Sequence, residues 1–178
     1  MLSSMDKKTR YLEAVADYLL AHGLKAASLR PMAKAIGTSD RMLIYHFGSK
    51  AELMEAALLR TSERLFERLQ GEWQDTSSPS QALGAVFGAL SGPELRGYSA
   101  LWQDIIAGAM RGDAVCRRAG ARMVEGYMPW LTDRMGDPDL AALTLAVIDG
   151  AAQLQAVDRD DDVRRALTAY LKLLESSR

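Results

Sequence analysis

The glycines at positions 23, 37 and 48 restrict the fold more than any other feature of the sequence. In the segments that these glycines end, apolar residues recur every three or four positions, which is the pattern of amphipathic helices. Glycine readily adopts the left-handed conformation that ends a helix. The sequence therefore predicts three short helices, over about 6–22, 28–36 and 39–47. The short, glycine-containing link between the second and the third is typical of a helix-turn-helix.

Serines precede the helices predicted after the first one. The hydroxyls of Ser28 and Ser39 can accept hydrogen bonds from the free amides of a first helical turn. Ser49 and Glu52 have the spacing of a capping box. We therefore expect a fourth helix to begin at Ser49 and to run toward Gln70.

Turn-forming stretches divide the rest of the chain into further helices. Gln74–Pro79 and Ser91–Pro93 interrupt the apolar periodicity. The helices predicted beyond them lie over about 94–111, 114–135, 138–157 and 161–176. No alternating pattern of useful length indicates a strand, and no repeat has a solenoid period.

The predicted fold class is therefore all-α, with two domains. The first, residues 1–50, is a helix-turn-helix head that consists of three helices. The second, residues 51–178, is a helical body, and the helix that begins at about 49 links the two.

Composition excludes several classes of protein. No apolar run approaches the ~18–20 residues that span a bilayer. The polar start MLSSMDKK lacks the apolar core of a signal peptide. The lone Cys116 cannot form an internal disulfide and has no second cysteine or nearby histidine with which to share a metal. We expect a cytoplasmic protein without a membrane segment, metal or cofactor.

Charge is unevenly distributed along the chain. The net charge is −1, yet residues 1–50 hold eight basic and four acidic residues, a net of +4, which leaves −5 for the remainder. A basic head suits a protein of which one end faces phosphates, because phosphate neutralisation releases counterions. Chance partition of charge is the alternative explanation.

The predicted third helix has two different faces. At 100° per residue, Leu43 and Phe47 lie on one side and Thr38, Arg41 and Tyr45 lie near the other. A recognition helix in the major groove needs such a division, with apolar anchors behind and donors such as arginine in front. The alternative is that the outer residues are merely solvated.

The stretches Met32–Gly37 and Leu43–Lys50, followed by Glu52 and Leu53, closely resemble the DNA-binding head of the TetR family of bacterial transcriptional regulators. The resemblance covers about residues 8–60. It implies a symmetric dimer that binds double-stranded operator DNA. It also implies a variable C-terminal domain that usually binds a small molecule and then releases the operator.

The resemblance also assigns roles to individual residues. Positions at the start of the second helix meet phosphates, those at the start of the third vary with the bases that are read, and the later aromatic positions press on the backbone. The DNA-binding residues implied in this way are Ser28, Arg30, Thr38, Ser39, Asp40, Arg41, Met42, Tyr45, His46 and Lys50.

Several of these side chains also suit roles within the protein itself. Ser28 and Lys50 are compatible with helix capping and solvation, and Asp40 is compatible with the helix dipole or the orientation of a neighbouring arginine. Ile44 departs from the family pattern, because family members commonly have a tyrosine there whose hydroxyl donates to a phosphate.

Aromatic and methionine side chains share faces of two helices in the body. Such stripes can enclose an apolar or amphipathic effector, although plain core is equally compatible with them. The candidate pocket residues are Tyr98, Trp102, Gln103, Ile106, Met123, Tyr127, Trp130 and Gln153, with Asp104 as a further polar candidate.

Small and apolar residues near the C-terminus allow two helices to approach closely. In the resembled family, this pair and its symmetry mate form a four-helix dimer interface. The candidate interface residues are Ala146, Gly150, Ala151, Leu167, Tyr170, Leu171 and Leu174. Intramolecular packing alone is the alternative.

The sequence thus favours a dimeric, ligand-responsive transcriptional regulator, a repressor that leaves a palindromic operator when a small molecule binds. A DNA-binding dimer without a small-molecule ligand, either architectural or regulated by another protein, is the second hypothesis. An enzyme is the third and least favoured. The sequence holds two histidines, His22 and His46, and no glycine-rich phosphate loop or H-E-x-x-H motif.

Overall fold

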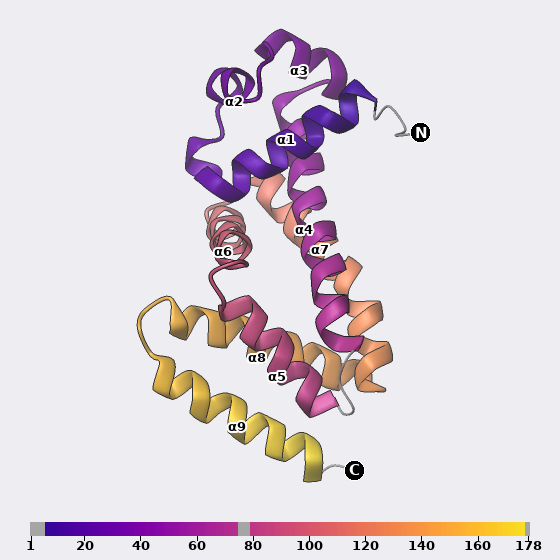
Figure 1. The fold of residues 1–178 in the computed structure, drawn as a ribbon, viewed down its shortest axis with the longest axis vertical. Helices are drawn as coiled ribbons and strands as arrows, with labels where there is room; N and C mark the ends of the chain where they lie inside the picture. The colour runs from indigo at the N-terminus through magenta and orange to yellow at the C-terminus, as the bar shows by residue number, and fades with distance from the viewer. Residues whose placement is uncertain (1–5, 75–78, 177–178) are drawn as a thin grey trace. The chain divides into compact units, whose positions relative to one another are not determined.

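The computed structural model describes residues 6–74 and 79–176 (Figure 1). Within these ranges the secondary structure consists of α-helices and one short 3-10 helix, η1 (Leu24–Ala26), without a strand. The predicted all-α class is confirmed. Residues 1–5, part of the polar start of the chain, and residues 75–78, part of the predicted Gln74–Pro79 linker, lie outside the described residues. None of the described helices is both long enough and apolar enough to cross a bilayer.

The first four α-helices agree closely with the predicted ones. They are α1 (Lys7–His22), α2 (Leu29–Ala35), α3 (Asp40–Phe47) and α4 (Lys50–Gln74). The three glycines that predicted the helix ends have positive φ values, 71° at Gly23, 72° at Gly37 and 88° at Gly48. Because this region is strained for residues with a side chain, glycine is the residue that suits these turns.

The serine caps differ from one another. Ser39 Oγ accepts a hydrogen bond from the Met42 amide at 3.2 Å, as predicted. Ser49 Oγ accepts from the Glu52 amide at 3.1 Å and donates to the Glu52 carboxylate at 2.8 Å, which confirms the capping interaction at the start of α4. The prediction for Ser28 is wrong. It occupies the N-cap position of α2, but its side chain makes no capping hydrogen bond.

The remaining helices are α5 (Pro79–Ser91), α6 (Arg96–Met110), α7 (Ala114–Met135), α8 (Pro138–Gln155) and α9 (Asp160–Ser176). Four of them match predicted helices, whereas α5 is absent from the predictions. Its sequence is apolar on most sides and contains Gly84 and Gly88, so it lacks the amphipathic pattern on which the predictions depend.

The chain divides into two compact units. Unit 1 contains residues up to Glu67 together with Arg96–Val124, and unit 2 contains Arg68–Leu95 together with Glu125–Arg178. The helices α4 and α7 each contribute to both units. The predicted boundary near residue 50 divides the chain by function, which these contacts do not test.

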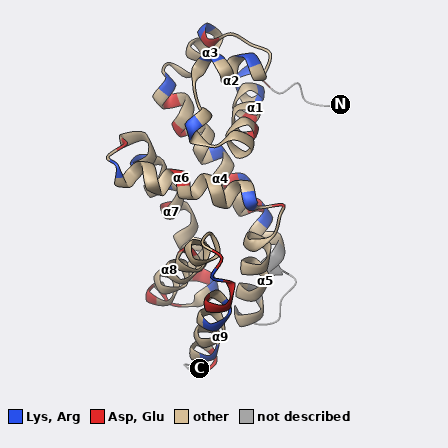
Figure 2. Ribbon diagram, turned by 90° about the vertical axis from the view of Figure 1, so that its left-hand side faces the viewer, with Lys and Arg blue, Asp and Glu red and all other residues tan. Residues whose placement is uncertain are grey.

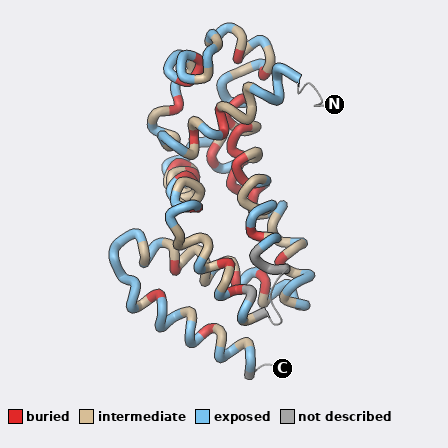
Figure 3. The backbone as a smooth tube through the Cα atoms, in the orientation of Figure 1, coloured by how far each residue is buried: buried red, intermediate tan, exposed pale blue. Residues whose placement is uncertain are grey.

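The core of unit 1 joins α1–α4 to α6. Figure 3 shows buried positions in the middle of α1 and along the first half of α4. The largest fully buried side chains of this unit are Val15, Leu19, Met32, Leu43, Leu53, Leu58, Thr61 and Ile105. Burial of each leucine or isoleucine side chain stabilises the fold by about 1.5–3 kcal/mol. α6 therefore belongs to the same core as the three short helices.

Ion pairs also connect the helices of unit 1. Glu13 on α1 accepts hydrogen bonds from Arg60 Nε at 2.6 Å and from Arg64, both on α4. Although burial alone would raise the pKa of the Glu13 carboxyl, the hydrogen bonds from Arg64 and Arg60 hold it below its ordinary value. Glu55 on α4 similarly accepts from Arg118 and Arg122 on α7, at 3.2 Å each.

Unit 2 is organised around the packing of α8 against α9. Thr144 and Tyr170, both buried, share a hydrogen bond between their hydroxyls at 2.5 Å. Ala141, Ala151 and Val163 are also buried. The turn between the helices contains Asp158, which has a φ of 60°.

Candidate DNA-binding surface

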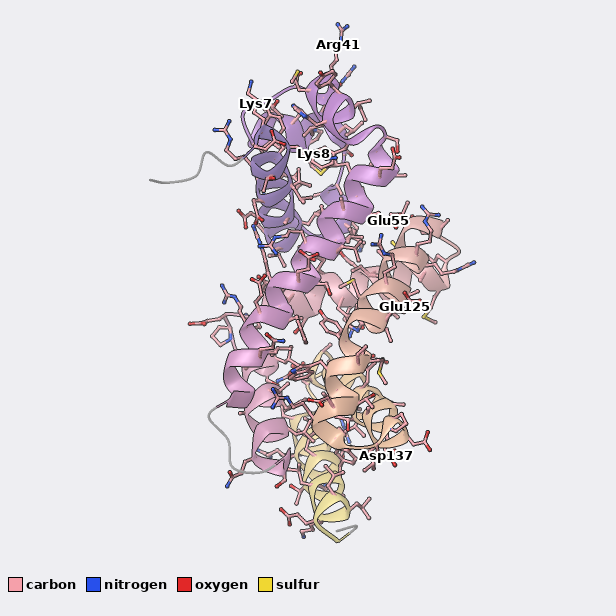
Figure 4. The ribbon with its side chains drawn as sticks, turned by 90° about the vertical axis from the view of Figure 1, so that its right-hand side faces the viewer. Lys7, Lys8, Arg41, Glu55, Glu125 and Asp137 are labelled. Carbon is pink, nitrogen blue, oxygen red and sulfur yellow. The ribbon has the colours of Figure 1, made fainter. Side chains whose placement is uncertain are left out.

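The two faces of α3 have the predicted environments. Leu43 is 0% exposed and Phe47 is 8% exposed, so these side chains anchor the helix in unit 1. Tyr45 is 78% exposed. Arg41 is exposed as well and extends away from the rest of unit 1 in Figure 4. α3 therefore presents an arginine and a tyrosine on a firmly held helix.

The predicted DNA-binding residues lie at the start of α2, in the turn between α2 and α3, on α3 or at the start of α4. Those with exposed side chains are Ser28, Arg30, Ser39, Arg41, Tyr45 and Lys50. Those of intermediate exposure are Thr38, Asp40, Met42 and His46, together with the atypical Ile44. The structure therefore brings the whole predicted set together within unit 1, and their contacts with DNA stay a prediction.

Asp40 contacts an arginine of the preceding helix. Its Oδ2 lies 3.7 Å from Arg30 Nε, and its Oδ1 accepts a hydrogen bond from the Arg41 amide at 2.9 Å. The two side chains of the Arg30–Asp40 pair are 91% and 46% exposed, so the pair contributes little to stability, about 0–1 kcal/mol. This geometry agrees with the alternative in which Asp40 orients an arginine.

His46 is placed differently from Tyr45. Its ring lies edge-on to Tyr11 of α1, with centroids 5.4 Å apart, and also to Tyr45, at 5.2 Å. His46 Nε2 is buried and has no hydrogen-bond partner among the described residues. In this arrangement His46 supports the exposed Tyr45 ring and joins it to α1. The sequence does not indicate this contact, because Tyr11 and His46 are far apart in the chain.

Basic side chains at the start of α1 lie beside α3, and the predicted set does not include them. Lys8 Nζ lies 5.5 Å from the centroid of the Phe47 ring. Figure 2 shows lysine and arginine positions on α1 as well as on α2 and α3. The excess of positive charge in the first fifty residues is the signal in the sequence that could have indicated these positions.

The predicted pocket residues are divided between the two units. Unit 1 contains Tyr98, Trp102, Gln103, Ile106 and Met123, and unit 2 contains Tyr127, Trp130 and Gln153. Met123 is buried, Gln153 is exposed and the others are intermediate. The further polar candidate Asp104 accepts a hydrogen bond from the Leu24 amide through its Oδ2, at 3.0 Å, and its place in a pocket stays a prediction. Its carboxylate joins α6 to η1.

The predicted dimer residues have different exposures. Ala151 and Tyr170 are buried in the packing of unit 2 itself, and Ala146 is exposed. Gly150, Leu167, Leu171 and Leu174 are intermediate. The exposed large apolar side chains of α8, α9 and the turn between them are instead Leu143, Leu154, Val157 and Leu173. These four side chains are not in the predicted set, and the predicted dimer contacts stay a prediction.

Comparisons with known proteins agree with this geometry. The family model for bacterial regulatory proteins of the tetR family matches residues 12–57, which include α2, α3 and the start of α4. A search of curated proteins finds no match.

Several solved structures have a similar fold. A Rhodococcus sp. protein described as a TetR-family transcriptional regulator has a TM-score of 0.74 at 21% identity, over 95% of this chain and 96% of that one. A transcriptional regulator from Saccharomonospora viridis, in complex with choline, has a TM-score of 0.72 at 20% identity, over 93% and 95%. The multidrug binding protein EbrR, complexed with imidazole, has a TM-score of 0.70 at 26% identity, over 92% and 88%.

The matched segment therefore coincides with the surface on which Arg41, Tyr45 and Lys50 are displayed, and the fold extends the likeness to the rest of the chain. Residues 12–57 thus match the tetR family of bacterial regulatory proteins, and the chain shares its fold with solved structures of transcriptional regulators.

Proposed function

We propose that the chain is a dimeric repressor that binds a palindromic operator and leaves it when a small molecule binds. The observation that carries this proposal is the structure of α3, in which buried Leu43 and Phe47 hold a helix that exposes Arg41 and Tyr45. A helix of this kind fits the major groove of DNA. The net charge of +4 over residues 1–50 supplies the attraction to phosphates.

The side chains on this surface would contact different parts of the DNA. The Arg41 guanidinium can donate two hydrogen bonds to guanine O6 and N7 in the major groove. Lys50, exposed at the start of α4, can bind a phosphate, because its ammonium group is a compact charge without base preference. Ile44 offers apolar contact alone, so this position cannot donate the backbone hydrogen bond that a tyrosine would donate.

Arg41 and Lys50 can be distinguished by substitution. After operator sequences have been selected from genomic fragments, we expect Arg41→Ala to cost about 1–3 kcal/mol on the selected sequence and to relax preference at the base pair that it reads. Lys50→Ala should weaken all sequences alike and reduce the salt slope of log K by about 1 for each copy, which is about 2 for the dimer. Fluorescence anisotropy at several salt concentrations measures both quantities.

The control for these substitutions is Lys172→Ala, which removes an exposed cation on α9 in unit 2. It should leave affinity and slope close to those of the wild type. If the wild-type chain binds no DNA, or binds it with no salt dependence, the proposed function is wrong.

The exposed apolar face of α8 supports dimerisation. Leu143, Ala146, Gly150, Leu154 and Val157 succeed one another at steps of three or four residues, so they lie along one stripe of the helical surface and just beyond its end. A stripe containing small residues lets a second helix approach closely. Two copies related by a two-fold axis would bury the same stripe on each. The two heads could then read half-sites about 34 Å apart, or a multiple of that spacing.

An arginine in this stripe should prevent the dimer. In the Leu154→Arg variant, the two-fold axis would place the arginines of both copies in the apolar contact between them. Burial of these two like charges destabilises the dimer. We expect a shift from dimer to monomer at micromolar concentration in sedimentation velocity, and weaker operator binding. Ala156→Arg, an exposed position off the stripe, adds the same charge and should stay dimeric. A dimeric Leu154→Arg variant would contradict the assignment of this face.

The release step follows from differential affinity. A small molecule that prefers a conformation with misaligned heads must weaken operator binding, and the operator must weaken its binding by the same factor. The neighbours complexed with choline and with imidazole support an effector of this kind. Thermal-shift screening of the full chain separates this proposal from ligand-free regulation, because a true effector raises the melting temperature and also releases DNA.

A further inference from the structure

Three basic residues at the start of α1 form an exposed cluster, which we term the α1 patch: Lys7, Lys8 and Arg10. None of them makes an ion pair within the part of the chain that the structure describes. Arg60 and Arg64 differ from them, because both are paired with Glu13. The cations of the α1 patch are therefore available to an anionic partner.

The stability of α1 does not explain this cluster. Positive charges in a first helical turn oppose the helix dipole, and the first turn of α1 contains no acidic residue that would offset them. The preceding Asp6 makes no capping hydrogen bond through its side chain. The basic residues thus slightly destabilise the helix that carries them.

The α1 patch adjoins the exposed face of α3. Lys8 Nζ lies over the Phe47 ring, 5.5 Å from its centroid, at the end of α3. Tyr11, one turn after Lys7 and Lys8, contacts the ring of His46, and His46 contacts the exposed Tyr45. Figure 4 shows Lys7, Lys8 and Arg41 at the same end of unit 1. A long ligand that contacts the Tyr45 ring would therefore also come close to the α1 patch.

We propose that Lys7, Lys8 and Arg10 bind phosphates of the operator duplex that flank the bases read by α3. This inference rests on the proposed function and adds a second contact region to it. Lysine ammonium groups bind phosphates as point charges, without a preference for base sequence. The partially buried His46 then has a structural part in the same surface, because its ring fixes the position of Tyr45 relative to α1.

The test is the triple variant Lys7→Gln, Lys8→Gln, Arg10→Gln, compared with the wild type on the selected operator and on a scrambled duplex. Removal of one phosphate contact should reduce the slope of log K against log salt by about 0.9. Because both copies of the dimer lose three contacts, we expect a reduction of between about 4 and 6, an equal fold-loss of affinity on both duplexes and an unchanged base preference.

The matched control is Arg117→Gln, Arg134→Gln, Lys172→Gln. These three exposed cations lie outside residues 1–50, and their removal changes the net charge by the same amount. It should leave the slope within about 0.5 of the wild-type value, because log K responds to the phosphates contacted rather than to total charge. The single variant Lys8→Gln should lower the slope by about two contacts, one from each copy of the dimer, which keeps the test valid if the triple variant folds poorly.

The outcomes separate this inference from the proposed function. If the wild type binds the operator and the triple variant keeps the wild-type slope, the α1 patch does not bind phosphates and the proposed function stands. If the triple variant changes base preference, or if the control variant reduces the slope equally, the phosphate assignment is also overturned. If the wild type binds no DNA at all, both proposals are wrong.

Discussion

Replacement of Leu43 by alanine is expected to lower the free energy of unfolding by about 2–5 kcal/mol and to abolish operator binding. The Leu43 side chain is 0% exposed and holds the eight-residue α3 in unit 1. So short a helix is not stable by itself, and its position depends on the packing of this face. A typical domain is stable by about 5–15 kcal/mol, so the loss is a large fraction of the total. Urea unfolding, followed by circular dichroism, measures it.

Tyr45→Ala is the matched control for Leu43→Ala. Tyr45 lies two residues further along α3 and is 78% exposed, so its removal should change the unfolding free energy by less than about 0.5 kcal/mol. It should nevertheless weaken DNA binding if its ring presses on the sugar-phosphate backbone. Equal stability of the two variants would show that α3 is not anchored through Leu43.

Gly97→Ala is expected to destabilise the chain by about 1–3 kcal/mol. A Cβ atom at this position would lie 2.9 Å from the carbonyl oxygen of Leu20, and the obstacle is backbone rather than a flexible side chain. α6 could therefore accept the methyl group only by moving away from α1. Chemical unfolding of the purified variant measures the effect.

The control for Gly97→Ala has the opposite expected sign. A Cβ at Gly126, in the interior of α7, would meet nothing within 4 Å. Gly126→Ala should therefore stabilise the chain by about 0.5–1 kcal/mol, the usual gain of alanine over glycine in a helix. If both variants are stabilised, α6 does not pack against α1 as closely as described.

Features that depend on neighbours in sequence could be predicted. The helix ends at Gly37 and Gly48 and the cap at Ser39 all involve residues within a few positions of one another. The exposure of Arg41 and the burial of Leu43 follow from helical periodicity alone. The helix α5 could not be predicted in this way, because an apolar segment with glycines has no polar face that would reveal its period.

Features that depend on distant residues could not be predicted. The contact between Tyr11 and His46, which explains the partial burial of the histidine, requires the packing of α1 against α3. The hydrogen bond from the Leu24 amide to Asp104 joins residues 80 positions apart. A carboxylate on an amphipathic helix gives no sign of which backbone amide it will meet, so the sequence could not indicate the hydrogen bond that Asp104 makes.

The hydrogen bond between Asp104 and Leu24 also affects which helices have to be exchanged together in a chimaeric protein. The Leu24 amide of η1 donates to α6, and α1 also packs against α6, a helix that comes long after the head in sequence. A fragment cut at residue 50 would lack that helix and would expose part of its own core to water. Domain exchange among relatives would therefore have to move α6 together with the first four helices, although the sequence suggests a simple cut between two modules.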